Sequence, residues 1–213
     1  GIWCVPKYSN PEGITYSDNV VKRMAALKPA AGDFRIFWDN AYAVHDFGEV
    51  GDELADIFTV AEEYGNIDRI FYYTSTSKIT FPGAGVACMV ASEKNMKWTK
   101  KLLGVQAIGP DKINQARHVK FFGNAEGVKA HMKKHAAIIQ PKFSVVLYVL
   151  NKEIAPLGIG KWVSPKGGYF VSFDAMEGCA KRIVSLAAEA GVVMTGAGAT
   201  YPYGKDPKDS NIR

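Results

Sequence analysis

The chain has 213 residues, of which 47% are hydrophobic and 22% are charged, and its formal net charge is +5. This length allows one or two domains with a sizeable core, and the composition is ordinary for a soluble globular protein. The basic residues are scattered and no aromatic-interleaved basic motif accompanies them, so nucleic-acid binding is not indicated. No apolar run reaches transmembrane length and no signal peptide opens the chain.

The metal-ligating residue types do not form a recognisable site. Cys4, Cys88 and Cys179 lie far apart, are odd in number and lack metal-ligand spacing, which predicts reduced thiols in a cytoplasmic protein. His131 and His135 are four residues apart, as two helical ligands would be, but two lysines lie between them and no third ligand is near. A solvated helix face is therefore predicted there, with no metal.

Strands and helices alternate through the first half of the chain. Strands are predicted at residues 1–5, 34–38, 69–73 and 85–92, and helices at residues 18–27, 51–65 and 93–104. Ser17 is the predicted N-cap of the first helix, and Gly65 is predicted to end the second. This order implies βαβ units and a mostly parallel sheet, in which ligands gather at the carboxyl ends of the strands.

The second half has a different pattern. A long helix is predicted from about residue 124 to residue 151, with Pro141 expected to kink or split it. A turn and strand at 160–173, a helix at 180–191 and a short strand at 192–195 follow. The sequence thus predicts an α/β first domain over residues 1–123. A linker helix and a small, incomplete α+β domain are predicted over residues 124–213.

Polar residues follow the first three predicted strands. They are Asn10 in "SNPEG", Asp39 and Tyr42 in "DNAY", and Lys78 in "STSK". Taken singly, the last three have ordinary interpretations as a turn aspartate, a packed aromatic and a surface lysine. If the strands are parallel, however, all of them reach one edge of the sheet. Together they suit pyridoxal phosphate, because a carboxylate keeps the pyridine nitrogen protonated and a lysine holds the aldehyde as a Schiff base.

The chain resembles the fold-type I pyridoxal-phosphate enzymes, most closely the class I aminotransferases and a bacterial branch that includes aspartate aminotransferases. The resemblance rests on five short motifs that keep the family's order and approximate spacing across the whole chain. These motifs are "SNPEG", "DNAY", "STSK", "PKGGYF" and the final "NIR".

The resemblance implies roles for the residues around the cofactor ring. Lys78 would be the Schiff-base lysine and the proton shuttle. Asp39 would pair with the pyridinium nitrogen, and Asn10 and Tyr42 would hydrogen-bond the 3-oxygen of the ring. His45, three residues after "DNAY", is a weaker candidate for the same pocket.

The same resemblance implies which residues bind the cofactor phosphate and the substrate carboxylate. Ser75 would bind the phosphate, with Ser77 a weaker candidate, and Arg213 would take the substrate's α-carboxylate, with Asn10 beside it. The chain departs from the family at Gly85, where an arginine usually neutralises the phosphate. Backbone N–H groups or another cation would have to replace that arginine.

As a whole, the resemblance implies an aminotransferase that moves an amino group from an amino acid, such as aspartate, to a 2-oxo acid such as 2-oxoglutarate. It also implies a cytoplasmic homodimer whose chain is about double this length, so that these residues form its carboxyl-side half. Two alternatives stay open on the same fold. One is a lyase or decarboxylase, and the other is the effector-sensing domain of a bacterial transcription regulator.

Overall fold

The computed structural model describes residues 1–213, and contacts divide the chain into two compact units. Unit 1 comprises residues 1–7, 15–45 and 52–134, and unit 2 comprises residues 8–14, 46–51 and 135–213. Each unit is therefore built from segments that are separate in the sequence. The domain division after residue 123 stays a prediction.

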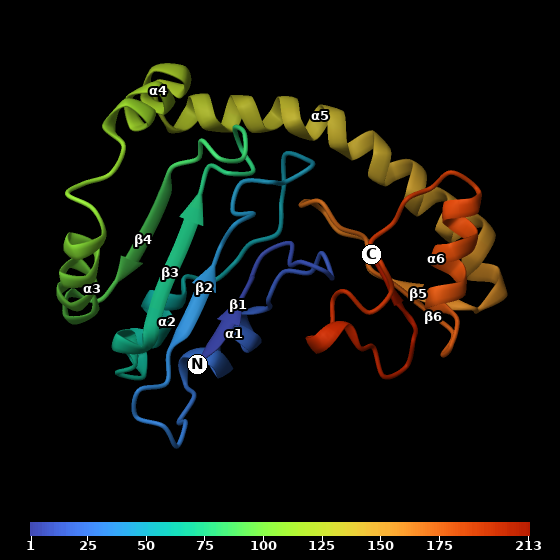
Figure 1. Ribbon diagram of the computed structural model, residues 1–213, viewed down its shortest axis with the longest axis horizontal. Helices are drawn as coiled ribbons and strands as arrows, with labels where there is room; N and C mark the ends of the chain where they lie inside the picture. The colour runs from blue at the N-terminus through green and yellow to red at the C-terminus, as the bar shows by residue number, and fades with distance from the viewer. The chain divides into compact units, whose positions relative to one another are not determined.

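Unit 1 contains a four-stranded sheet. Its strands, in spatial order, are β1 (Ile2–Cys4), β2 (Ile36–Asp39), β3 (Ile70–Ser75) and β4 (Ala87–Ala91). β1, β2 and β3 run parallel, which confirms the predicted mostly parallel sheet, but β4 is antiparallel to β3, as its reversed arrow in Figure 1 shows. The connection from β3 to β4 contains no crossover helix, and a parallel return would need one.

Two helices cover one face of this sheet and form the core with it. They are α1 (Asp18–Ala25) and α2 (Ile57–Glu63), and Trp38 of β2 is 0% exposed beneath them. The Ser17 side chain accepts the Val20 N–H, so the predicted N-cap is confirmed. The second helix is shorter than predicted because the Asp56 carboxylate accepts N–H groups of the following turn and starts the helix there.

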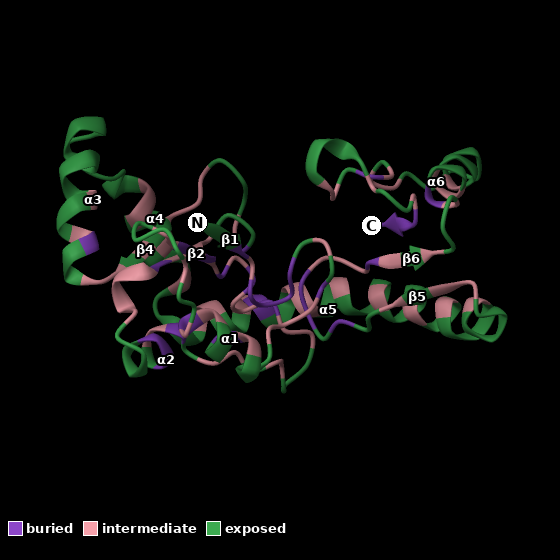
Figure 2. Cartoon of the chain, turned by 90° about the horizontal axis from the view of Figure 1, so that it is seen from below, coloured by how far each residue is buried: buried purple, intermediate pink, exposed green.

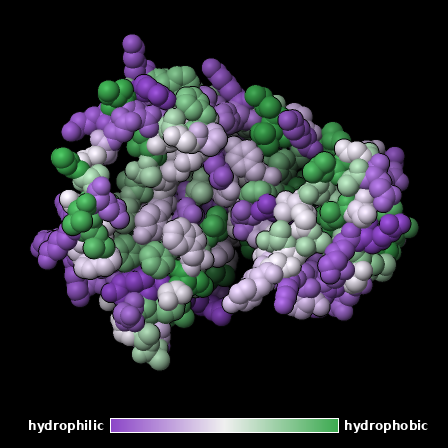
Figure 3. All heavy atoms as spheres, in the orientation of Figure 1, coloured by the Kyte–Doolittle hydropathy of each residue, from purple (hydrophilic) through white to green (hydrophobic).

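The other face of the sheet carries a row of aromatic rings. Trp3 stacks on Phe37 at 5.4 Å and on Tyr73 at 5.6 Å between centroids, and Phe37 stacks on Phe71 at 5.8 Å. Trp3 is 60% exposed although it belongs to this row. Hydrophobic side chains reach the surface at several separate places on the face seen in Figure 3.

The remaining helices of this region are α3 (Glu93–Gln106), α4 (Lys112–Phe122) and α5 (Ala125–Val149). α4 was not predicted from the sequence. α5 runs on through Pro141 as one helix, so the alternative that the proline splits it was wrong. Much of α3 is exposed, as Figure 2 shows. None of the helices is both long and apolar enough to cross a membrane.

Unit 2 contains a three-stranded antiparallel sheet and one further helix. The strands are β5 (Gly160–Trp162), β6 (Phe173–Ala175) and β7 (Asn211–Ile212), and the helix is α6 (Ala180–Glu189). The strand predicted at residues 192–195 is absent. Thr195 makes one backbone hydrogen bond, to the Arg213 carbonyl oxygen at 3.3 Å, which is not enough to form a ladder.

Four short helical turns complete the secondary structure. They are three 3₁₀ turns and one π turn, at Ile67–Arg69, Ala155–Leu157, Pro202–Gly204 and Leu150–Ile154 respectively. The structure holds no group of three or more His, Cys, Asp or Glu side chains that could bind a metal ion.

Candidate active site

The carboxyl ends of β2 and β3 bring two predicted site segments together in unit 1. Asp39 is the last residue of β2 and is paired in register with Tyr73, while Ser75 ends β3 two residues later. The Asn40 N–H donates to the Tyr73 carbonyl oxygen at 2.9 Å, which continues the pairing past the end of β2. The parallel strands thus place "DNAY" beside "STSK", as the sequence predicted.

Strand alternation directs Asp39 away from the core. Trp38 points into the buried side, so Asp39 lies on the same face as the aromatic row. The Trp3 indole Nε1–H donates to Asp39 Oδ2 at 3.2 Å. This bond holds the carboxylate at the sheet edge and leaves oxygen lone pairs available for another donor.

Tyr42 and Lys78 meet across these two segments. Tyr42 is 2% exposed, and the Lys78 Nζ lies 5.9 Å from the centroid of its ring. The His45 ring contacts Tyr42 edge-on at 5.5 Å between centroids. A phenol, an imidazole and an amine therefore lie close together. Asp39 ends the strand that leads to Tyr42, and it pairs with the strand that leads to Lys78.

The chain leaves β3 through one helical turn that carries Lys78. The N–H groups of Ile79 and Thr80 both donate to the Thr76 carbonyl oxygen at 2.9 Å. The Ser75 hydroxyl accepts the Ser77 N–H at 3.4 Å, and both Ser77 and Lys78 are exposed. The turn therefore presents hydroxyl groups and one amine to the outside.

Gly85 packs directly against this turn. A Cβ atom at Gly85 would lie 2.7 Å from Ser77 Oγ and 3.0 Å from Ser77 N. Both distances are shorter than ordinary van der Waals contact, so a side chain at residue 85 would push into the serine turn. Glycine at residue 85 therefore has a steric reason within this chain.

Unit 2 brings together Asn10 and Arg213, although 203 positions separate them in the sequence. Arg213 Nη1 donates to Asn10 Oδ1, and its Nη2 donates to Thr195 Oγ1 at 3.2 Å. The guanidinium carbon also lies 4.7 Å from the centroid of the Phe170 ring. Two residues predicted to bind substrate are therefore in contact.

The "SNPEG" and "PKGGYF" motifs pack against each other around this contact. A Cβ at Gly13 would lie 2.7 Å from the Phe170 carbonyl oxygen, and a Cβ at Gly168 would lie 2.7 Å from Tyr8 Cβ. Both glycines also have positive φ, of 69° and 75°. Their glycine identity allows the close approach that places Phe170 under Arg213.

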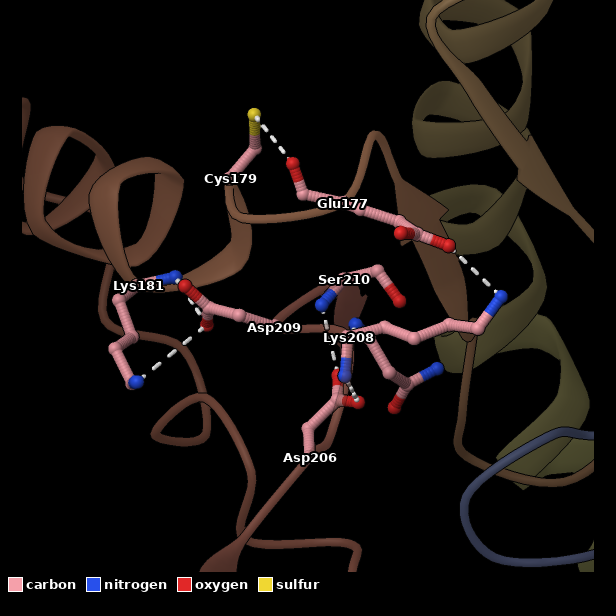
Figure 4. Close-up of polar contacts among 8 residues, drawn as sticks. Glu177, Cys179, Lys181, Asp206, Lys208, Asp209 and Ser210 are labelled. Carbon is pink, nitrogen blue, oxygen red and sulfur yellow. Dashed lines mark hydrogen bonds and ion pairs between the residues drawn. The ribbon is translucent and has the colours of Figure 1, made fainter.

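The loop that leads into β7 is organised by Asp206, which the sequence analysis did not single out. Its carboxylate accepts the N–H groups of Ser210 at 2.7 Å, Asn211 at 2.9 Å and Lys208 at 2.9 Å. Figure 4 shows Asp206 facing this backbone. These N–H groups hold the pKa of the Asp206 carboxyl below its ordinary value.

Other polar contacts near the site were also missed. The buried Tyr8 hydroxyl donates to Asp46 Oδ1 at 2.6 Å in unit 2. In unit 1, Nε2 of His118 on α4 is hydrogen-bonded to the Thr76 hydroxyl of the Lys78 turn. The helix α4 itself was not predicted. The N-cap Asp111 and the positive-φ Gly123 bracket that helix and are the signals that could have revealed it.

Comparison with known proteins identifies the family. The family model described as aspartate amino-transferase matches residues 1–213. An aspartate aminotransferase of Corynebacterium glutamicum is 48% identical over the whole chain, which covers 49% of that relative. The chain therefore spans about half the length of this relative.

Solved structures agree with this match. The crystal structure of an aspartate transaminase from Corynebacterium glutamicum has a TM-score of 0.94 and 48% identity, over 99% of this chain and 50% of that one. The α-aminoadipate aminotransferase of Thermus thermophilus, complexed with N-(5'-phosphopyridoxyl)-L-leucine, has a TM-score of 0.75 at 22% identity over 99% of this chain and 52% of that one, and shares the fold. The resemblance seen in the five motifs is confirmed, and the chain belongs to the aspartate amino-transferase family.

Proposed function

We propose that the protein containing this chain is a pyridoxal-phosphate-dependent aminotransferase that uses aspartate as amino donor and a 2-oxo acid as acceptor. The observation that carries the proposal is the meeting of Asp39, Tyr42 and the Lys78 turn at the carboxyl ends of two adjacent parallel strands. The family match and the named relatives support the reaction type.

The side chains present in unit 1 fit this cofactor. Asp39 offers a carboxylate for a protonated ring nitrogen, and its bond from Trp3 fixes one of its oxygens. Tyr42 offers a phenol and Lys78 an amine on the neighbouring segment. When bound, the cofactor supplies an electron-withdrawing ring that makes the Cα proton of the amino acid acidic.

Lys78 is the residue to which we assign the proton transfer. Its exposed position on a tight turn leaves the amine accessible, while the turn's backbone hydrogen bonds fix its origin. The amine would take the proton from the Cα of the amino acid. It would then deliver that proton to the cofactor carbon that is bonded to the amino nitrogen. Tyr42 packs beneath the lysine and would donate its phenolic hydrogen bond to a ring oxygen.

The phosphate would be held by hydroxyl and backbone N–H groups. Ser75 and Ser77 supply the hydroxyl groups, and their turn already shows a hydroxyl bonded to a backbone N–H. Because Gly85 leaves no space for a side chain against Ser77, no charge from residue 85 contributes. The α-aminoadipate aminotransferase relative carries a phosphopyridoxyl compound, which supports a phosphate-bearing ligand for this fold.

Arg213 and Asn10 are the residues we assign to the substrate carboxylate. The guanidinium is held by Asn10, by Thr195 and by the Phe170 ring. A fork fixed in this way suits a planar carboxylate better than a flexible ammonium does. A homodimer, implied by the family resemblance, stays a prediction that light scattering of the intact protein would test.

The proposal is tested by locating the cofactor's attachment. The intact protein is incubated with pyridoxal phosphate, reduced with borohydride and digested, and the modified peptide is identified by mass. We expect the label at Lys78 and its loss in Lys78→Ala, whereas Lys97→Ala, an exposed lysine of α3 paired with Glu93, keeps it. A label on another lysine, or none, would refute the assignment. A labelled protein that converts neither aspartate nor any other amino acid would instead favour a sensing role.

A further inference from the structure

The turn that carries Lys78 is held by side chains from outside the turn. Residues 76–80 form a single helical turn, in which two N–H groups share the Thr76 carbonyl oxygen. A turn this short cannot use the carbonyl groups at its end in further helical bonds, because the chain then leaves through Phe81 and Pro82. Those carbonyl groups need other donors.

Histidine rings bond this turn at four points. Nε2 of His45 lies 3.2 Å from the Lys78 carbonyl oxygen, and Nε2 of His131 lies 2.9 Å from the Ile79 carbonyl oxygen. Nε2 of His118 lies 2.9 Å from Thr76 Oγ1 and 3.2 Å from Thr80 Oγ1. Three of the chain's four histidines therefore contact four of the five residues of this turn.

The partners determine which nitrogen carries the proton. A carbonyl oxygen only accepts, so His45 and His131 must donate from Nε2. His118 Nδ1 lies 2.8 Å from the Asn114 carbonyl oxygen and must donate there, which makes Nε2 of the neutral ring an acceptor. The Thr76 hydroxyl then donates to His118 and accepts the Val86 N–H at 2.9 Å.

The three rings come from different elements and are themselves fixed. His45 follows β2, is 4% exposed and packs edge-on against Tyr42. His131, on α5, contacts Phe121 at 5.3 Å and Phe122 at 5.5 Å between centroids, both edge-on. Because each ring is held by further contacts of its own, it can transmit the position of those neighbours to the turn.

We propose that His45, His118 and His131 are positioning residues that fix the backbone of residues 76–80 and thereby direct the Lys78 amine. The proposal rests on the function assigned to Lys78 above. A lysine side chain has four rotatable bonds, so the region that its amine can reach depends on where its backbone origin is fixed. Small displacements of a reacting group can cost up to about 100-fold in rate, so a fixed origin has a direct effect on the chemistry.

The test compares two substitutions at each carbonyl-bonding histidine in the intact protein. His131→Leu and His45→Leu remove the donor, whereas His131→Gln and His45→Gln keep an N–H donor at a similar reach. The matched control is Asn95→Leu, which removes a buried side-chain bond to the Asp68 carbonyl oxygen, 2.8 Å long, elsewhere in unit 1. The readouts are the rate at which Lys78 captures pyridoxal phosphate, followed by absorbance, and hydrogen exchange of peptides covering residues 74–87.

We expect each leucine variant to slow capture by about ten-fold and to speed exchange of residues 76–80, because a part-buried carbonyl loses its donor. The glutamine variants should recover to within about three-fold of wild type. Asn95→Leu should lower stability but leave the capture rate unchanged. Unchanged capture in the leucine variants, or an equal slowing in Asn95→Leu, would overturn the positioning role. A wild-type protein that captures no cofactor at Lys78 would instead overturn the proposed function.

Discussion

Replacing Gly85 by alanine should destabilise the protein, although most glycine-to-alanine changes at compatible sites do the opposite. The new Cβ would lie 2.7 Å from Ser77 Oγ, 3.0 Å from Ser77 N and 3.1 Å from Ser77 Cα. The hydroxyl can rotate away, but the two backbone atoms can move only with the whole Lys78 turn. The substitution is therefore a small overpacking of the candidate phosphate site.

The expected size follows from two opposing contributions. Overpacking of this kind costs roughly 1–3 kcal/mol. The loss of backbone freedom in the unfolded chain returns about 0.4–1 kcal/mol. A net loss of about 1 kcal/mol in the free energy of unfolding is expected.

Gly104→Ala is the matched control. Gly104 lies inside α3, and nothing lies within 4 Å of the position that its Cβ would take. Alanine is favoured over glycine in a helix interior by about 0.5–1 kcal/mol, so this variant should gain stability. Urea denaturation of both variants should therefore place their unfolding free energies about 2 kcal/mol apart.

A second measurement links the packing to the site. Affinity for pyridoxal phosphate should fall in Gly85→Ala and stay unchanged in Gly104→Ala. Gly85→Arg, which restores the residue usual in the family, should weaken binding as well, because its Cβ meets the same turn. If Gly85→Ala is as stable as wild type, or if Gly85→Arg binds the cofactor more tightly, the steric explanation of Gly85 is wrong.

Two further predictions concern charged residues. Asp39→Ala should lower the transamination rate at least about ten-fold. Trp3→Phe keeps an aromatic ring but removes the N–H bond to Asp39, so it should lower the rate by a smaller factor. Stopped-flow rates within two-fold of wild type for Asp39→Ala would contradict the role of this carboxylate. The pKa of Asp206 is lowered by N–H donors of Asn211 and Ser210, so its contribution to stability is present above the ordinary aspartate value of 3.8 and is lost as pH falls through the lower folded-state pKa. Asp206→Asn should therefore remove part of the acid-induced loss of stability in a pH series of urea unfolding curves, and an unchanged acid limb would refute this.

The elements that were predicted well have strong local signals. β2 and β3 are runs of apolar and aromatic residues, and Ser17 and Ser92 cap helices that follow at once. α4 was missed because none of its residues is buried, so it has no apolar stripe for a periodicity argument to detect. The direction of β4 also depends on the length of its connection, which the strand sequence does not encode.

The candidate site also combines residues that the sequence could predict with contacts that it could not. Asp39 and Lys78 were placed together because strand ends in a parallel sheet share an edge, which is a rule of topology. The histidine contacts to the Lys78 turn join residues that are 33, 38, 42 and 52 positions apart, and no local pattern marks them. Helical spacing drew attention to His131 as half of a metal pair, whereas its ring nitrogen bonds a backbone carbonyl.

Arg213 is the residue whose role depends most on tertiary contacts. Its two terminal nitrogens bond Asn10 and Thr195, and its plane lies near Phe170. Three contacts on one guanidinium fix the direction of the side chain before any ligand arrives. Fixing an arginine in this way costs side-chain entropy, which an ordinary surface arginine would not lose. The fixed orientation is expected of an arginine that binds a carboxylate in one defined geometry.

Arg213→Lys should therefore raise KM for aspartate steeply while leaving the affinity for pyridoxal phosphate unchanged. The lysine keeps the charge but loses the fork and two of its fixed partners, and a hydrogen bond to a charged group contributes about 1.5–3 kcal/mol, so KM should rise roughly 10- to 150-fold. Arg182→Lys, an exposed arginine on α6 near Glu189, is the control and should change KM by less than about two-fold. Half-reaction titrations with aspartate, alanine and an aromatic amino acid give KM for each substrate. A KM for aspartate that stays within two-fold in Arg213→Lys would refute the carboxylate role. A wild type that prefers the aromatic amino acid would leave transamination in place and remove aspartate as the donor.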